Sequence, residues 1–126
     1  YTSCPVCPML PARGEDVCTA IYKVSSPGKG IKKIKEESVF NINEWLDKIN
    51  EPTIFVGEGA IKYNNIIKKR LGKLTLFAPL SSNYLRGSDI AFQATNKMAR
   101  ATKFSSLNLK AEYLRPAVEK IEKKRK

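Results

Sequence analysis

TIFVGEGAIKYNNIIKKRLG, residues 53–72, is the stretch that decides the fold class of this chain. Its first four residues form an apolar run rich in β-branched and aromatic side chains, which predicts a buried strand. The run leads through Gly57 and Gly59 into Ala60–Leu71, where apolar residues recur with helical spacing and Gly72 supplies the stop. The sequence therefore predicts a strand, a glycine turn and a helix in succession.

Further strands and helices are predicted on both sides of this unit. Prolines at positions 5, 8 and 11 confine a first strand to an edge or a bulge, because proline has no N–H to donate. The predicted elements are that strand at Val6–Leu10, a central strand at Val17–Val24, its hairpin partner at residues 31–40, a helix from Asn41 to about Asn50, the strand at 53–56, the helix at Ala60–Leu71, a strand at Leu74–Ala78 and a helix from Ser88 to about Thr102.

Two of the predicted helices have recognisable ends and faces. Asn41 and Glu44 have the spacing of a capping box, and Ile42, Trp45, Leu46 and Ile49 follow on one helical face that we expect to be core. Ser88 is expected to cap the last helix. The small or apolar residues of its inner face, expected to pack on a sheet, are Ala91, Ala94, Thr95, Met98 and Ala101.

This order of elements predicts an α/β domain with a mixed sheet, the ribonuclease-H-like half of the actin-like ATPase fold. The strand hairpin comes first, and helices and strands then alternate. We expect the domain to span residues 1–116 and a basic tail to occupy 117–126. No apolar run approaches the roughly 20 residues of a membrane helix, and no secretory leader is evident, so we expect a cytoplasmic protein.

The composition disfavours enzymes that depend on histidine. The 126 residues contain no histidine, which removes the commonest general base and metal ligand, so we expect no catalytic residue and no metal site. Cys4 and Cys7 form a CPVC motif, but Pro8 and Pro11 prevent the helix that a redox motif requires. A structural zinc site needs four ligands, and Cys18 is the only further thiol. The three cysteines are therefore predicted to be ordinary reduced thiols.

The chain carries 23 basic and 12 acidic residues, a net charge of +11 that favours polyanions. The residues expected to make such a contact are Lys62, Lys68, Lys69, Arg70 and the tail. Basic runs of this kind are more often solvated faces, and no aromatic-rich RNA-binding signature accompanies them. A stand-alone basic RNA-binding domain remains the alternative reading.

Three segments have a combined pattern that extends over most of the chain: PMLPARGEDVCTAIY at Pro8–Tyr22, FVGEGA at Phe55–Ala60 and AEYLRP at Ala111–Pro116. Together they resemble the C-terminal half of the TsaB (YeaZ) family, the non-catalytic glycoprotease-like relatives of TsaD. The chain departs from the family at Pro11, Gly14, Cys18 and Ala111, where the family usually has aspartate, arginine, tyrosine and proline. The family's N-terminal half has no counterpart here, so we expect one domain of a larger protein.

The resemblance implies a scaffold rather than an enzyme. TsaB-like proteins pair with TsaD, which transfers a threonylcarbamoyl group to the adenosine beside certain tRNA anticodons, and the ATPase TsaE docks on that pair. The implied partners are thus a TsaD-like transferase and a TsaE-like ATPase, with tRNA reached indirectly through the complex. Self-association is a further expectation, and no firmly bound cofactor is implied beyond an adenine nucleotide at a complex interface.

The resemblance also singles out individual residues, each with a plainer alternative. Gly57 and Gly59 are candidates for a turn beside a nucleotide, and the alternative is a tight connection between strand and helix. Arg13 matches a family arginine and is either a partner contact or a solvated loop residue. Tyr113 and Arg115 match the terminal family segment, where they either bind a partner or pack the tail onto the domain.

Overall fold

The computed structural model describes residues 4–26, 30–100, 110 and 113–114. It divides into two compact units, Tyr1–Tyr84 and Leu85–Lys126. The first unit contains the sheet, and the second contains one described helix. The boundary predicted between residues 116 and 117 lies outside the described residues.

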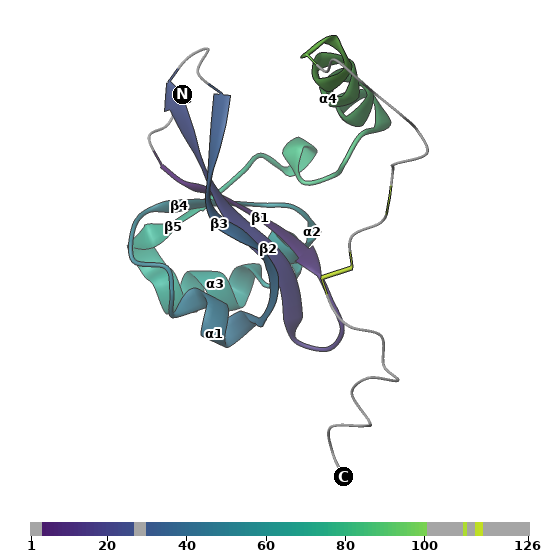
Figure 1. Ribbon diagram of the computed structural model, residues 1–126. Coiled ribbons are helices and arrows are strands. Elements are labelled where there is room, and N and C mark those ends of the chain that lie inside the picture. The colour runs from purple at the N-terminus through teal and green to yellow at the C-terminus, as the bar shows by residue number, and fades with distance from the viewer. Residues whose placement is uncertain (1–3, 27–29, 101–109, 111–112, 115–126) are drawn as a thin grey trace. The chain divides into compact units, whose positions relative to one another are not determined.

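The first unit is built on a mixed five-stranded sheet (Figure 1). The strands lie in the order β3-β2-β1-β4-β5; β2 is antiparallel to both neighbours, and β1, β4 and β5 are parallel. The predicted α/β class with a mixed sheet is confirmed. The elements are β1 Val6–Pro11, β2 Asp16–Ser26, β3 Gly30–Asn41, α1 Ile42–Leu46, β4 Thr53–Val56, α2 Glu58–Lys62, α3 Asn64–Leu71, a 3-10 turn at Gly72–Leu74, β5 Thr75–Phe77, a 3-10 turn at Leu80–Ser82 and, in the second unit, α4 Gly87–Arg100.

The prolines predicted an edge or a bulged position for β1; the strand lies at the centre of the sheet, so the edge alternative was wrong. The sheet accommodates Pro8 by local irregularity. Pairing of β1 with β2 runs from Val6 opposite Tyr22 and resumes at Met9 opposite Thr19, and the register of β2 against β3 shifts at this level. The Thr19 hydroxyl donates a hydrogen bond to the Pro8 carbonyl at 2.9 Å. A side-chain donor on β2 thus bonds the backbone of β1 where proline interrupts the ladder.

The core of the first unit lies between one face of the sheet and helices α1, α2 and α3. In Figure 1, α1 and α3 both lie below the strands. The predicted core residues Ile42, Trp45, Leu46 and Ile49 are all buried. The helix itself is shorter than predicted, because α1 ends at Leu46 and Ile49 lies beyond it. Asn41 caps this helix by accepting a hydrogen bond from the Asn43 N–H at 3.0 Å. The buried cluster comprises Cys7, Met9, Val17, Ile42, Trp45, Leu46, Ile49, Phe55, Ala60, Tyr63 and Ile67.

The single helix predicted at Ala60–Leu71 is two helices that meet at Tyr63. Tyr63 leaves helical geometry at ψ 14°, and its ring is buried. Its hydroxyl donates to the Gly14 carbonyl, 3.1 Å away on the turn between β1 and β2. This long-range bond offers a reason for the break that local periodicity could not reveal. Gly72 ends α3 with φ 52°, as predicted.

Helix α4 of the second unit begins earlier than predicted. The Asp89 and Ile90 N–H groups donate to the Arg86 carbonyl at 3.1 and 3.3 Å, so Arg86 rather than Ser88 flanks the first turn. Ala91, Ala94, Thr95 and Met98 are exposed, and Ala101 lies outside the described residues. None of the helices among the described residues has both the length and the apolar character to span a bilayer.

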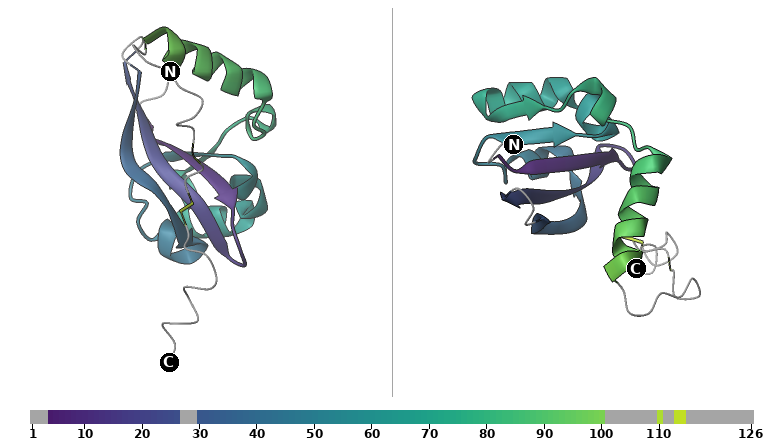
Figure 2. Two further views of the ribbon diagram at one scale, coloured as in Figure 1. Left: turned by 45° about the vertical axis from the view of Figure 1, so that its right-hand side comes forward. Right: turned by 90° about the horizontal axis from the view of Figure 1, so that it is seen from above.

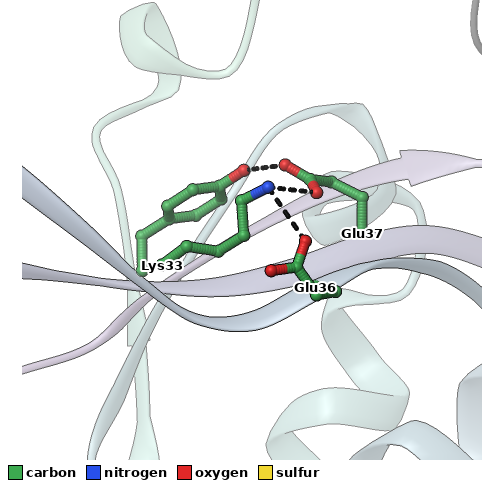
Figure 3. Close-up of polar contacts among 4 residues, drawn as sticks. Lys33, Glu36 and Glu37 are labelled. Carbon is green, nitrogen blue, oxygen red and sulfur yellow. Dashed lines mark hydrogen bonds and ion pairs between the residues drawn. The ribbon is translucent and has the colours of Figure 1, made fainter.

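A cluster of four side chains ties β2 to β3 on the solvent side of the hairpin (Figure 3). The Lys33 ammonium lies 3.0 Å from Glu36 and 2.6 Å from Glu37, and the Tyr22 hydroxyl donates to the other Glu37 oxygen. The bonds from Lys33 and Tyr22 lower the pKa of Glu37 from 4.5 to about 2. The same carboxylates raise the pKa of Lys33, Glu37 contributing most.

We expect the Glu37 cluster to stabilise the hairpin in a pH-dependent way. A lowered pKa in the folded chain stabilises the fold above about pH 4.5, and that stabilisation is lost as the pH falls towards about 2. Glu37→Gln should therefore lower the melting temperature by a few degrees at neutral pH and by nothing near pH 2. Thermal melts at several pH values measure this, with exposed Glu44→Gln as control. A difference that persists unchanged at pH 2 would contradict the prediction.

Candidate functional site

The candidate site lies where the parallel strands β1, β4 and β5 end. Gly57 follows β4 directly, and the segment 78–83 follows β5. In open α/β sheets, ligands bind outside the carboxyl ends of parallel strands, because the loops there leave a crevice. Both predicted glycines lie at this end of the sheet.

Close packing against β1 explains both glycines. A Cβ at Gly57 would lie 2.6 Å from the Met9 carbonyl oxygen. Gly57 also has φ 101°, a backbone conformation that residues other than glycine rarely adopt. A Cβ at Gly59 would lie 2.8 Å from the Met9 Cβ and 2.9 Å from its carbonyl oxygen. The two glycines thus allow the start of α2 to lie directly on the backbone of the central strand.

Asn83 completes the glycine turn and was not predicted. Its side chain is 8% exposed, and its Oδ1 accepts a hydrogen bond from the Gly57 N–H at 2.7 Å. The Nδ2 group donates to the carbonyls of Pro79 and Leu80 at 3.3 and 3.5 Å. Asn83 therefore clamps the loop after β5 onto the turn after β4. The partners are 26 residues apart, so no local pattern in the sequence could identify the contact.

A pocket of about 160 Å³ opens beside this clamp. Asn64, the first residue of α3, contributes a side-chain oxygen that is buried and has no hydrogen-bond partner among the described residues. The pocket walls are mainly apolar and come from α2, β5 and the loop after β5. Its lining residues are Ala60, Ile61, Asn64, Phe77, Ala78, Leu80 and Asn83. The site is therefore a small, mainly apolar cavity, and one of its lining residues, Asn64, has a buried oxygen without a hydrogen-bond partner among the described residues.

Arg13, the other predicted site residue of the first unit, does not join this pocket. It lies on the turn between β1 and β2; its side chain is exposed, and no described residue pairs with its guanidinium. Tyr113 belongs to the second unit and is 86% exposed. Arg115 lies outside the described residues.

The four bases predicted as a polyanion contact lie on α2 and α3. Lys62 lies over the Tyr63 ring at 4.9 Å, and Lys68 lies over the Phe77 ring at 5.4 Å. Arg70 forms an ion pair with Asp47 and also donates to Asn43 at 3.3 Å. Lys69 is exposed. Arg70 is therefore partly neutralised by α1, and the group presents less free charge than its sequence suggests.

The cysteines are free thiols, as predicted. Cys7 is buried in β1 with its sulfur 3.2 Å from the Thr19 hydroxyl, and burial raises its thiol pKa. Burial also raises the thiol pKa of Cys18, and the charge of Glu37 adds to this shift. A raised pKa lowers the fraction of reactive thiolate, which fits a structural role for both residues.

Comparison with known proteins does not identify the chain. No protein-family model matches it, and no curated protein matches it either.

The contact between Gly59 and Met9 makes Gly59 intolerant of a side chain. We expect Gly59→Ala to lower the free energy of unfolding by about 1–3 kcal/mol, because the added methyl group would overlap the β1 backbone. Urea denaturation followed by the fluorescence of buried Trp45 measures the change. Gly87→Ala is the control, since a Cβ there meets nothing within 4 Å. Equal stability of the two variants would contradict the close packing.

Proposed function

We propose that this chain is the C-terminal half of a TsaB-like protein and adopts the ribonuclease-H-like half of the actin-like ATPase fold. In this proposal it is a non-catalytic scaffold of the complex that makes threonylcarbamoyladenosine in tRNA. Its partners are a TsaD-like transferase and a TsaE-like ATPase. The scaffold role is in keeping with a chain of 126 residues that contains no histidine.

The strand order is the observation that carries the proposal. Strands β1, β2 and β3 form an antiparallel meander, and β4 and β5 are then added in parallel on the other side of β1. Helices separate β3 from β4 and β4 from β5. A meander followed by alternating helices and parallel strands is the layout that the ribonuclease-H-like half requires. Because one fold serves many functions, the scaffold role rests on the family resemblance as well.

Two of the resembling segments meet in space. Pro8–Tyr22 covers most of β1 and β2, and Phe55–Ala60 runs from β4 into α2. Their meeting point is the contact of Met9 with Gly57 and Gly59. The resemblance therefore falls on residues that depend on one another for packing, which supports a shared fold more strongly than isolated motifs would.

The pocket is the place where an adenine nucleotide would enter at a complex interface. The Gly57 N–H already donates to Asn83 and is therefore not free to donate to a nucleotide. In this proposal the glycine turn would contribute only by lying close to the ligand. Asn64 presents the unsatisfied oxygen that an exocyclic amino group could satisfy, and Ile61 and Phe77 supply apolar contact for a flat ring. The role of the glycines would then be indirect, because they position α2 along the pocket.

The scaffold proposal predicts a stable complex. We expect the chain to co-elute with a TsaD-like protein in size-exclusion chromatography with light scattering, and to recruit a TsaE-like ATPase to the pair. Arg13→Glu should weaken the pair at least several-fold if this exposed arginine contacts a partner carboxylate. Lys69→Glu is the matched control, with the same charge change on exposed α3. Failure to bind any TsaD-like protein would refute the proposal.

The nucleotide pocket has its own test. Ile61→Glu places a carboxylate at the pocket wall and should reduce ATP binding by the assembled complex about tenfold or more, by charge repulsion and lost apolar contact. Isothermal titration calorimetry measures the affinity. Ile66→Glu is the control, because Ile66 has the same 37% exposure as Ile61 but does not line the pocket. Equal affinities for the two variants would place the nucleotide elsewhere.

A further inference from the structure

The hairpin of β2 and β3 extends well beyond the rest of the sheet. Strand β1 pairs with β2 only as far as Tyr22, whereas β2 and β3 pair on to Ser26 and Gly30. Figure 2 shows this two-stranded extension in a second view. We call the described residues of this extension, 23–26 and 30–34, the basic arm. It projects beyond the amino end of β1, at the opposite end of the sheet from the pocket.

The arm concentrates positive charge, and among its described lysines only Lys33 is paired with carboxylates. From Tyr22 to Lys35 the chain has five lysines and no carboxylate. Lys23 on β2 lies directly opposite Lys32 on β3, and neither has an ion-pair partner among the described residues. Like charges directly opposite each other destabilise a hairpin. The facing of Lys23 and Lys32 therefore cannot be explained as a contribution to the stability of the hairpin.

The charge is paired only at the root of the arm. There Lys33 is held by Glu36 and Glu37, and Tyr22 braces Glu37 from the neighbouring strand (Figure 3). Lys35, just beyond the arm, lies over the Trp45 ring at 5.2 Å. The root is thus fastened to the folded unit, while farther out Lys32 is exposed and Lys23 is half-buried.

Protection of a sheet edge explains only part of this arrangement. Lysines on an edge strand discourage pairing with other chains, and β3 is an edge strand. Beyond Tyr22, where β1 no longer pairs with it, β2 is an edge as well, so edge protection accounts for a lysine on each strand. Edge protection does not require the two lysines to face each other. A ligand that neutralises both charges would relieve their repulsion.

We propose that the basic arm binds the phosphodiester backbone of RNA directly. The charges of the arm are all lysines, and a lysine ammonium binds a phosphate as a compact point charge. A nucleic acid carries one negative charge per nucleotide, so it can neutralise two adjacent ammonium groups at once. This contact goes beyond the scaffold role, in which RNA is reached through partner proteins.

The contact should be insensitive to base sequence. The described large apolar residues exposed on the arm are Ile31 and Ile34, and neither can stack on bases as an aromatic ring does. Tyr22 at the root is engaged with Glu37. Affinity would thus come from phosphates and fall steeply with salt.

The test compares two double variants that each lose two positive charges. Lys23→Gln with Lys32→Gln removes the facing pair, and Lys68→Gln with Lys69→Gln removes the same charge from α3. Fluorescence anisotropy over a range of KCl measures binding of the full chain to a tRNA transcript. We expect the arm variant to lower the slope of log K against log salt by about 1.4–1.8 and the affinity by about tenfold or more. The α3 variant should change the slope by less than half as much.

A third variant separates a loss of RNA binding from a loss of folding stability. Lys32→Glu would place a carboxylate opposite Lys23 and should raise the melting temperature while weakening RNA binding further. Equal losses in both double variants, or a larger loss in the α3 variant, would overturn the proposal. So would tighter binding to polyglutamate or phosphatidylserine vesicles than to RNA at equal salt. The measurement uses this chain alone, so its failure would leave the complex-formation result untouched.

Discussion

The contact between the start of α2 and the middle of β1 is the constraint on which the first unit depends. Gly57 and Gly59 lie so close to Met9 that a Cβ at either position would overlap the strand. This closeness sets α2 directly on the central strand, and Ala60 and Tyr63 are buried as a result. Met9 is itself fully buried. Loss of the contact would therefore loosen β1, β4 and α2 together.

The same contact defines the end of the sheet at which a ligand could bind. With α2 packed on β1, the loop after β5 lies against the turn after β4, where Asn83 accepts a hydrogen bond from the Gly57 N–H. The pocket then forms between α2, α3 and that loop. Asn64 and Asn83 are the polar residues among its mainly apolar lining, a mixture that is usual for a small-molecule site.

Charge is distributed unevenly over the first unit. Arg70 is tied to α1 through Asp47, and Lys33 is tied within the hairpin, so these bases stabilise local structure. Lys23 and Lys32 have no such role, and they lie beyond the amino end of β1 while the pocket lies at its carboxyl end. The proposed RNA contact and the proposed nucleotide pocket thus occupy opposite ends of the sheet. A scaffold could in this way present different surfaces to RNA and to a protein partner.

The sequence by itself determined the helices, strands and helix ends that depend on interactions between residues close together in the chain. Period-two and helical spacing predicted β2, β4, β5 and α1, and the caps at Asn41 and Gly72 lie where local chemistry placed them. The tertiary structure alone decided the central position of β1, the break at Tyr63 and the clamp by Asn83. Each depends on a contact between residues far apart in the chain: Thr19 with Pro8, Tyr63 with Gly14, and Asn83 with Gly57. Such partners leave no periodic signal, because hydrogen bonds between distant segments form only after the chain has folded.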